Sequence, residues 1–397
     1  MPHYRRVGEV PRKRHTQFRR PDGGLYAEEL LGIEGFSAES ALLYHHHLPT
    51  AVLDSQVFAG PVPVRTANHP LRPRHLRPRT LPTAGAEEGG EDAVTGRRYL
   101  LANDDVRLGA AVATAPSPLY RNAVGDECMY VESGTGVVES VFGALAVGPG
   151  DYVVLPVSTT HRWVPAEPLR LIVVEARGHI APPRRYLSAK GQFLESAPYC
   201  ERDLRAPEGP LCLAGSDADV PTDVVVAHRS GWTRFTYAHH PFDVVGWDGA
   251  LYPYAFNVAD FEPITGRIHQ PPPVHQTFEG PNFVICSFVP RKVDYHPLAV
   301  PVPYNHHNVD SDEVLFYCAG NYEARRGSGI AAGSISLHPA GCTHGPAPGS
   351  VERALGAEYF DELAVMVDTF RPLDLCADGL ACEDPDYAWS WARPPSA

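Results

Sequence analysis

The chain has 397 residues, of which 44% are hydrophobic and 20% are charged, a composition typical of a globular protein large enough for two domains. No stretch approaches the roughly 18 uninterrupted apolar residues that a membrane-spanning helix requires. The formal net charge of −13 argues against a broad nucleic-acid or anionic-membrane surface, since phosphate groups select basic proteins. We therefore expect neither nucleic acid nor a membrane as a partner.

The 35 glycines and 40 prolines favour short strands and turns over long helices. Residues 1–100 form a lead-in rich in Pro and Arg, in which we predict a few short strands, for example Ala51–Phe58. From about residue 105, short alternating or apolar runs recur roughly every 8–12 residues, which is typical of an all-β sandwich or barrel. Clear strands are fewer between residues 180 and 250 and return at 282–289, 313–320 and 333–341. We expect a helix near Phe360–Val367 and otherwise only short helical pieces.

The 8 cysteines form no CxxC pair, so we expect reduced, mostly packed thiols in a cytoplasmic protein. No apolar segment typical of a signal peptide follows Met1. The run His45-His46-His47 resembles a metal-binding tract. We interpret it instead as ordinary surface or interface histidines, because neither a carboxylate nor a second histidine cluster lies at ligand spacing.

An internal repeat is the most informative feature of the chain. One copy comprises Tyr120–Gly134 and Gly150–His161, and the other comprises His306–Gly320 and Gly333–His344, about 186 residues later. The two blocks of each copy resemble the paired motifs of the cupin superfamily, H-x-(H/N)-x(3,4)-E-x(6)-G and G-x(5)-P-x-G-x(2)-H. The resemblance implies two jelly-roll domains, a bicupin, and agrees with the all-β strand pattern.

The two copies differ in their candidate metal ligands. The second holds His306, Glu313 and His344 at motif spacing, and two imidazoles with one carboxylate suit Fe(II) in oxygen chemistry because they leave coordination positions open. The first has Tyr120 in place of the first histidine, so we expect it to be a degenerate, metal-free cupin. His307 remains an alternative to His306, since a bulge would exchange the two neighbours.

Longer stretches narrow the resemblance to one family. Segments 6–19, 240–279, 303–314 and 334–346 look like homogentisate 1,2-dioxygenase, and the similarity runs over almost the whole chain. The resemblance implies that the protein opens the ring of homogentisate with both atoms of dioxygen, giving maleylacetoacetate in phenylalanine and tyrosine catabolism. It also implies non-haem Fe(II) as the cofactor, and a homo-oligomer built as a trimer or hexamer.

The resemblance also implies roles for individual residues. The iron ligands fall on His306, Glu313 and His344, and the active-site histidine falls on His269, with His275 as the alternative. Substrate contacts fall on Tyr322 and Arg325, together with His344. Arg325 stands where the family has Lys; it keeps the positive charge for a carboxylate but changes the side-chain length.

Three functional alternatives remain open at this point. One is a dioxygenase for gentisate or another hydroquinone acid, which the Arg325 exchange keeps in play. Another is a non-enzymatic bicupin that binds a metal or small ligand, and a third is a bicupin isomerase or decarboxylase using Mn or Zn. We expect an N-terminal domain over residues 1–264, with the degenerate cupin around 105–180, and a catalytic cupin over 265–397.

Overall fold

The computed structural model describes residues 3–82, 90–213, 217–266 and 272–392. Within these ranges the protein is almost entirely β, with α1 (Ser350–Ala354) and α2 (Ala377–Ala381) as its two α-helices. The all-β bicupin prediction is confirmed. No helix in the described ranges is both long and apolar enough to cross a membrane.

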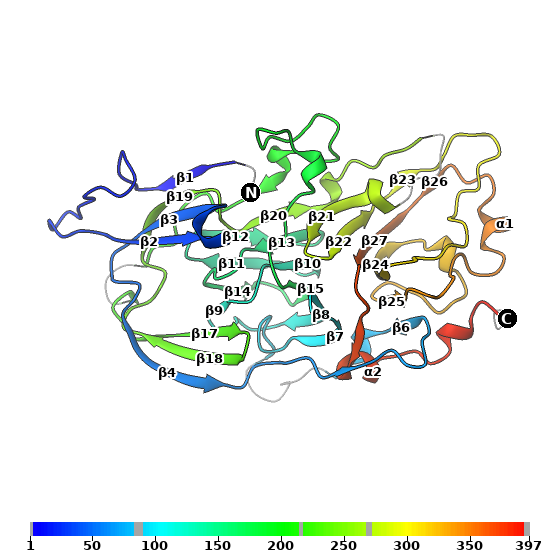
Figure 1. Ribbon diagram of the computed structural model, residues 1–397, viewed down its shortest axis with the longest axis horizontal. Helices are drawn as coiled ribbons and strands as arrows, with labels where there is room; N and C mark the ends of the chain where they lie inside the picture. Colours follow the sequence, from blue (N-terminus) through cyan, green and yellow to red (C-terminus); the bar gives the residue numbers. More distant parts are fainter. Residues whose placement is uncertain (1–2, 83–89, 214–216, 267–271, 393–397) are drawn as a thin grey trace.

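The N-terminal cupin is a sandwich of two sheets (Figure 1). In spatial order, the nine-stranded sheet contains β16 (Leu204–Arg205), β20 (Tyr254–Asn257), β13 (Asp151–Leu155), β10 (Glu127–Ser133), β15 (Leu169–Ala176), β8 (Val106–Ala113), β7 (Arg98–Ala102), β28 (Asp374–Cys376) and β5 (Arg65–Thr66). The seven-stranded sheet contains β12 (Gly143–Val147), β11 (Gly136–Ser140), β14 (His161–Pro165), β9 (Tyr120–Asn122), β17 (Thr222–His228), β18 (Gly231–Tyr237) and β4 (Val52–Phe58).

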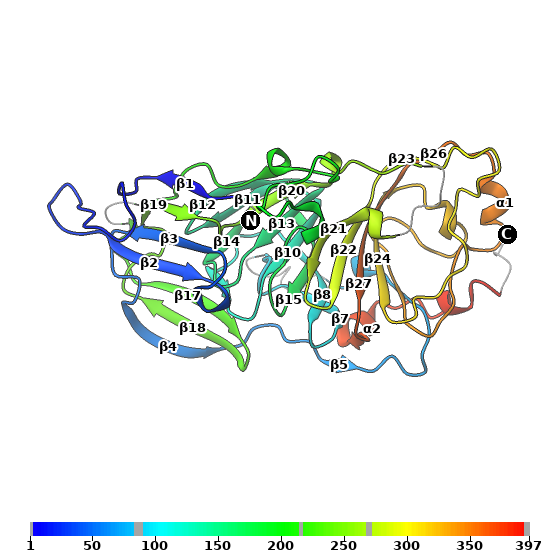
Figure 2. The same cartoon turned by 45° about the horizontal axis from the view of Figure 1, so that its top comes forward.

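The C-terminal cupin has one extended sheet, and a small sheet caps the opposite end of the molecule (Figures 1 and 2). The C-terminal sheet contains β21 (Gln276–Gly280), β22 (Phe283–Phe288), β27 (Glu362–Thr369), β24 (Asp312–Gly320), β25 (Ile335–His338) and β6 (Arg74–Leu76), and nearby β23 (Arg291–Lys292) pairs with β26 (Tyr359–Phe360). The small four-stranded sheet contains β1 (Arg5–Gly8), β19 (Val244–Gly249), β3 (Ser40–His45) and β2 (Ala27–Gly32).

The nine-stranded sheet is covered on both faces, which explains its nearly continuous apolar runs. One face packs on the seven-stranded sheet around buried residues such as Met129 and Trp163. The other face packs on the C-terminal sheet, where Tyr130 contacts Phe316 with ring centroids 6.2 Å apart. The two cupins therefore share a core. The opposite face of the C-terminal sheet is not part of this core and can carry a functional site.

Two short strands cross between the cupins. The strand β6, early in the chain, pairs with β25 in the C-terminal sheet, whereas β28, near the end, pairs with β7 in the N-terminal sheet. Each unit therefore receives one short strand from the other end of the chain.

One prediction about secondary structure is wrong. The segment Phe360–Val367, expected to be helical, forms most of β27, which pairs with β22 and β24 in the middle of the C-terminal sheet. A central strand buried on both faces has no polar alternation, so a short apolar run alone does not distinguish it from a buried helix.

Candidate metal centre

The repeat found in the sequence corresponds to the same strand register in both cupins. In the first, Tyr120 lies opposite His161, and in the second His306 lies opposite His344 in an antiparallel bridge. The main-chain N–H of His306 donates to His344 O at 2.8 Å, and the His344 N–H donates to His306 O at 2.9 Å. Motif spacing thus places the two histidines of the second copy side by side.

The residue before each motif glutamate anchors the second block of the motif. Asp312 accepts hydrogen bonds from the main-chain N–H groups of Ala340 and Leu373, both at 2.8 Å. Asp126 does the same in the first cupin, accepting from Val157 and Ile180 at 2.8 Å. These bonds fix the loop that carries the second histidine relative to the strand that carries the glutamate.

The glycine that closes the first block is required by its surroundings. Gly134 and Gly320 have φ of +84° and +91°, and a Cβ at either position would collide with a main-chain carbonyl, that of Pro168 or Asp361. A residue with a side chain would therefore be strained and would clash at both positions.

The three predicted ligands converge in the second cupin. Donor atoms of His306, Glu313 and His344 all lie within 4.8 Å of one another. The Nε2 atom of His306 is 3.7 Å from Glu313 Oε2, and Nε2 of His344 is 3.5 Å from Glu313 Oε1. On β24, Glu313 alternates with Val314, which packs into the shared core, so the carboxylate points to the opposite face.

Both histidines are oriented by a main-chain carbonyl. The Nδ1–H of His306 donates to Tyr304 O at 2.9 Å, and that of His344 donates to Cys342 O at 3.1 Å. This arrangement leaves Nε2 of each ring as the lone-pair atom facing Glu313, as in protein metal sites where a second hydrogen bond sets the tautomer. His307 is exposed, and its Nε2 accepts from the Gly341 N–H at 2.9 Å, outside this group.

Sequence reasoning missed a third histidine beside Glu313, His338, which lies opposite it on β25. Its Nδ1–H donates to Glu313 Oε1 at 2.8 Å, and its Nε2 accepts from the Tyr387 hydroxyl at 2.8 Å. Burial and the nearby Arg325 guanidinium lower the pKa of His338 to about 3, so the ring is neutral. Burial alone would raise the pKa of Glu313, but its interactions with the surrounding histidines hold it well below its usual range.

The donor set fits a transition metal such as Fe(II). It offers two imidazole nitrogens and one ionised carboxylate, and the buried Nε2 of His344 has no hydrogen-bond partner within the described part of the chain. A shielded lone pair without a donor is costly unless something binds it. His306, Glu313 and His344 would hold the ion on one face and leave the other open.

A cavity of about 420 Å³ adjoins the ligands. Its wall includes His306, Glu313 and Arg325, with the apolar side chains of Phe288 and Met366. His275 also lines it, buried against the Phe288 ring with centroids 4.5 Å apart. His269, the first choice for the active-site histidine, lies outside the described residues.

The predicted substrate-binding residues lie at different depths. Arg325 is buried in the cavity wall, donates to Gly345 O at 2.6 Å and contacts the Trp391 ring. It has no carboxylate within ion-pair distance among the residues that the structure describes. Tyr322 is buried behind the wall, with its ring edge-on to Tyr317, a wall residue, at 4.9 Å.

In the first cupin, the carboxylate of the motif glutamate, Glu127, is paired with an arginine. Arg97 NH1 donates to Glu127 Oε1 at 2.7 Å and to Glu175 Oε1 at 2.6 Å, and NH2 donates to Glu127 Oε2 at 2.9 Å. The Tyr120 hydroxyl donates to Glu127 at 2.9 Å, and the Tyr120 ring lies under the guanidinium at 5.1 Å. Within the described ranges, this glutamate belongs to no group of three converging metal donors. The Glu127 carboxylate is therefore held by Arg97 and Tyr120.

The interpretation of His45–His47 rested on a premise that the structure contradicts. His45 is buried between Asp243 and Glu29, with its ring nitrogens 2.7 Å and 3.1 Å from their carboxylates. His47 is 2.9 Å from Asp219, a residue from a distant segment. Carboxylates therefore do lie at ligand distance, supplied by folding rather than by nearby sequence.

Comparisons with known proteins agree with the motifs. The model of the homogentisate 1,2-dioxygenase N-terminal domain matches residues 110–258, and that of its C-terminal domain matches residues 271–394. A protein of Saccharolobus solfataricus described as "Putative dioxygenase SSO1533" is 38% identical over 397 residues, covering 98% of each chain. The homogentisate 1,2-dioxygenases of Emericella nidulans and Caenorhabditis elegans are each 28% identical over 60% of this chain.

The chain spans about half the length of these last two relatives, since the alignments cover 54% of each. Among solved structures, the Escherichia coli protein Ylba is similar with a TM-score of 0.36 and 9% identity, covering 79% of this chain and 94% of that one. That likeness is too low to bear on function. The two domain matches and the nearly full-length 38% identity show that this chain belongs to the homogentisate 1,2-dioxygenase family.

Proposed function

We propose that this protein is a mononuclear Fe(II) dioxygenase that opens the ring of homogentisate to give maleylacetoacetate. The observation that carries the proposal is the convergence of His306, Glu313 and His344 beside a cavity of about 420 Å³. Relatives named homogentisate 1,2-dioxygenase support the choice of substrate. Bound Fe(II) would supply the open coordination positions and the electron transfer that ground-state dioxygen needs to react with a closed-shell ring.

The cavity wall suits a small aromatic acid. Phe288, Leu315 and Met366 provide apolar surface for an aromatic ring. The proposed metal ligands His306 and Glu313 line another part of the same cavity wall. Holding the substrate ring beside the metal ligands replaces a bimolecular encounter with a fixed orientation. This lowers the activation free energy by several kcal/mol. The apolar lining also limits the water that reaches the reacting atoms.

Arg325 is our candidate for binding the substrate carboxylate. A buried guanidinium in the cavity wall, with no carboxylate at ion-pair distance among the described residues, can pair with an incoming anion. Its planar group can donate two parallel hydrogen bonds to a carboxylate. Tyr322, one layer behind the wall, would support this end of the cavity through Tyr317.

A histidine is our candidate for accepting a proton from the second ring hydroxyl. His275 lines the cavity and is packed against Phe288, so its ring position is restrained. His269 remains the first choice from the family resemblance. A neutral imidazole, with an ordinary pKa of about 6.5, suits proton acceptance near neutral pH.

An oxygen electrode tests the proposal. Purified chain loaded anaerobically with Fe(II) is mixed with homogentisate or gentisate, while oxygen uptake and ring-cleavage absorbance are recorded together. Uptake with homogentisate well above that with gentisate is the expected result. Preference for gentisate would replace the substrate but keep the chemistry, and no uptake with either by fully iron-loaded protein would refute the enzyme assignment.

A further inference from the structure

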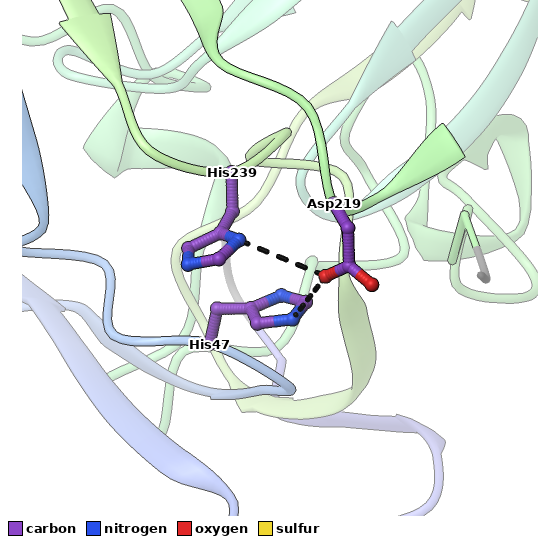
Figure 3. Close-up of side chains that lie close together, drawn as sticks. All are labelled: His47, Asp219 and His239. Carbon is purple, nitrogen blue, oxygen red and sulfur yellow. Dashed lines mark ion pairs between the residues drawn. The ribbon is translucent and has the colours of Figure 1, made fainter. Parts of the chain in front are cut away.

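A second group of metal-type donors comes from segments that flank three strands of the N-terminal half of the chain (Figure 3). His47 follows β3, Asp219 precedes β17, and His239 lies between β18 and β19. Their donor atoms all lie within 4.8 Å of one another. We propose that these three side chains bind a divalent transition-metal ion of the zinc type, which ties together the three segments that carry them.

The orientation of His47 is set as in known metal sites. Its main-chain N–H donates to Asp243 Oδ2 at 2.8 Å, and its Nδ1–H donates to the same oxygen at 3.0 Å. Asp243 is itself held through Oδ1, which is 2.7 Å from the buried His45 ring. Metal-binding histidines commonly donate their second ring N–H to a carboxylate in this way, which fixes the tautomer and the ring direction. The other ring nitrogen, Nε2, then faces Asp219 Oδ1, 2.9 Å away.

His239 supplies the second independent observation. Its Nδ1 atom is shielded from solvent and has no hydrogen-bond partner in the described part of the chain, although the ring itself is partly exposed. That atom lies 3.7 Å from Asp219 Oδ1, which is too long for a hydrogen bond. A shielded nitrogen directed at a carboxylate without bonding to it is explained if a cation binds between them.

A simple ion pair accounts for the arrangement less well. The rings of His47 and His239 stack with centroids 4.0 Å apart and an angle of 9° between their planes. Two imidazolium rings at that spacing would repel each other, so an ion pair with Asp219 would use one histidine only. A divalent ion would use the neutral form of both, with Asp219 offsetting part of its charge. One ring would turn out of the stack on binding, because the lone pairs of two nearly parallel rings lie in separate planes.

The ligand types select the class of metal. Two imidazole nitrogens and one carboxylate oxygen favour Zn²⁺ or a similar ion over Ca²⁺ or Mg²⁺, which prefer oxygen ligands. Asp219 is 60% exposed, so a fourth position would face solvent and take water. The proposed site uses no residue of the iron centre, and it stands or falls independently of the ring-cleavage activity.

Zinc stoichiometry of the full chain tests the site. Metal-free protein is dialysed against Zn²⁺ alone, and bound zinc is measured together with protein. Wild type should bind two equivalents, one at each group of donors. His239→Ala and Asp219→Asn should bind one, because loss of a direct ligand weakens binding by more than about 100-fold, the upper end for loss of an outer-shell partner. Both changed side chains are partly exposed, so the fold should tolerate them.

Two further variants separate this site from the iron centre and from casual binding. His46→Ala removes the neighbouring histidine, which is outside the group, and should still bind two equivalents. His344→Ala should bind one, and His344→Ala with His239→Ala should bind none. Zinc contents of His239→Ala and Asp219→Asn equal to that of wild type would overturn the proposal.

Discussion

We predict that the folding stability of the first cupin depends on the positive charge of Arg97. Its side chain has no exposed surface and bridges Glu127 and Glu175, which are 1% and 5% exposed. Arg97→Met keeps the length of the side chain but leaves two buried carboxylates without their shared cation. Removing one partner of a buried ion pair costs about 3–5 kcal/mol, because the remaining charge has lost its compensation.

The pKa of Glu127 gives a similar magnitude. Burial alone would raise it, but the charge and hydrogen bonds of Arg97 lower it from 4.5 to about 2. That difference corresponds to about 3 kcal/mol. Because the folded-state value lies below the unfolded one, this stabilisation is complete above about pH 4.5 and is lost as the pH falls towards 2.

Urea unfolding at pH 7, followed by tryptophan fluorescence and far-UV circular dichroism, measures the loss. Arg107→Met is the matched control, since Arg107 contacts the same Glu175 at 3.4 Å but is 29% exposed, and its loss should cost no more than about 1 kcal/mol. The difference in unfolding free energy between wild type and Arg97→Met should become smaller on acidification, because the unpaired Glu127 of the variant takes up a proton at a higher pH. Equal stability of the two variants at pH 7 would refute the role of Arg97.

Three further changes have distinct expected outcomes. Arg325→Gln should raise KM for homogentisate about 10- to 150-fold, as expected for loss of a charge-assisted hydrogen bond; an unchanged KM would remove Arg325 from substrate binding. Tyr120→Phe should leave turnover nearly unchanged and cost about 1–3 kcal/mol in unfolding free energy, since only its bond to Glu127 is lost; a large fall in kcat would make the first cupin catalytic. His338→Gln should weaken Fe(II) binding about 10- to 100-fold in an anaerobic titration, because it removes the hydrogen bond that orients Glu313, and undiminished affinity would contradict that role.

The convergence of His306, Glu313 and His344 was predictable because motif spacing determines strand register. His306 and His344 face each other across one antiparallel bridge, and Glu313 is near the start of β24 on the face away from the core. Each of these placements follows from a local pattern of a few residues. His338 was harder to identify because it lies within an apolar strand, where a single histidine carries no signal of its own.

Other features depend on contacts that no local pattern encodes. Arg97 lies 30 residues before Glu127. Nothing in the local sequence of a loop arginine indicates that the side chain is buried in the fold. His47 meets Asp219 and His239 only because the ends of β3, β17 and β18 come together in the folded chain. The strand β27 was mistaken for a helix because its central position, rather than its composition, determines its state.

Oxygen consumption by wild type and two variants tests the central claim most directly. Wild type, Glu313→Gln and Asp219→Asn are supplied with Fe(II) and homogentisate, and uptake is recorded with metal content and circular dichroism for each. We predict rapid uptake by wild type and Asp219→Asn, and none above background by folded Glu313→Gln. Uptake by Glu313→Gln at the wild-type rate would show that the His306, Glu313 and His344 group is not the catalytic metal centre.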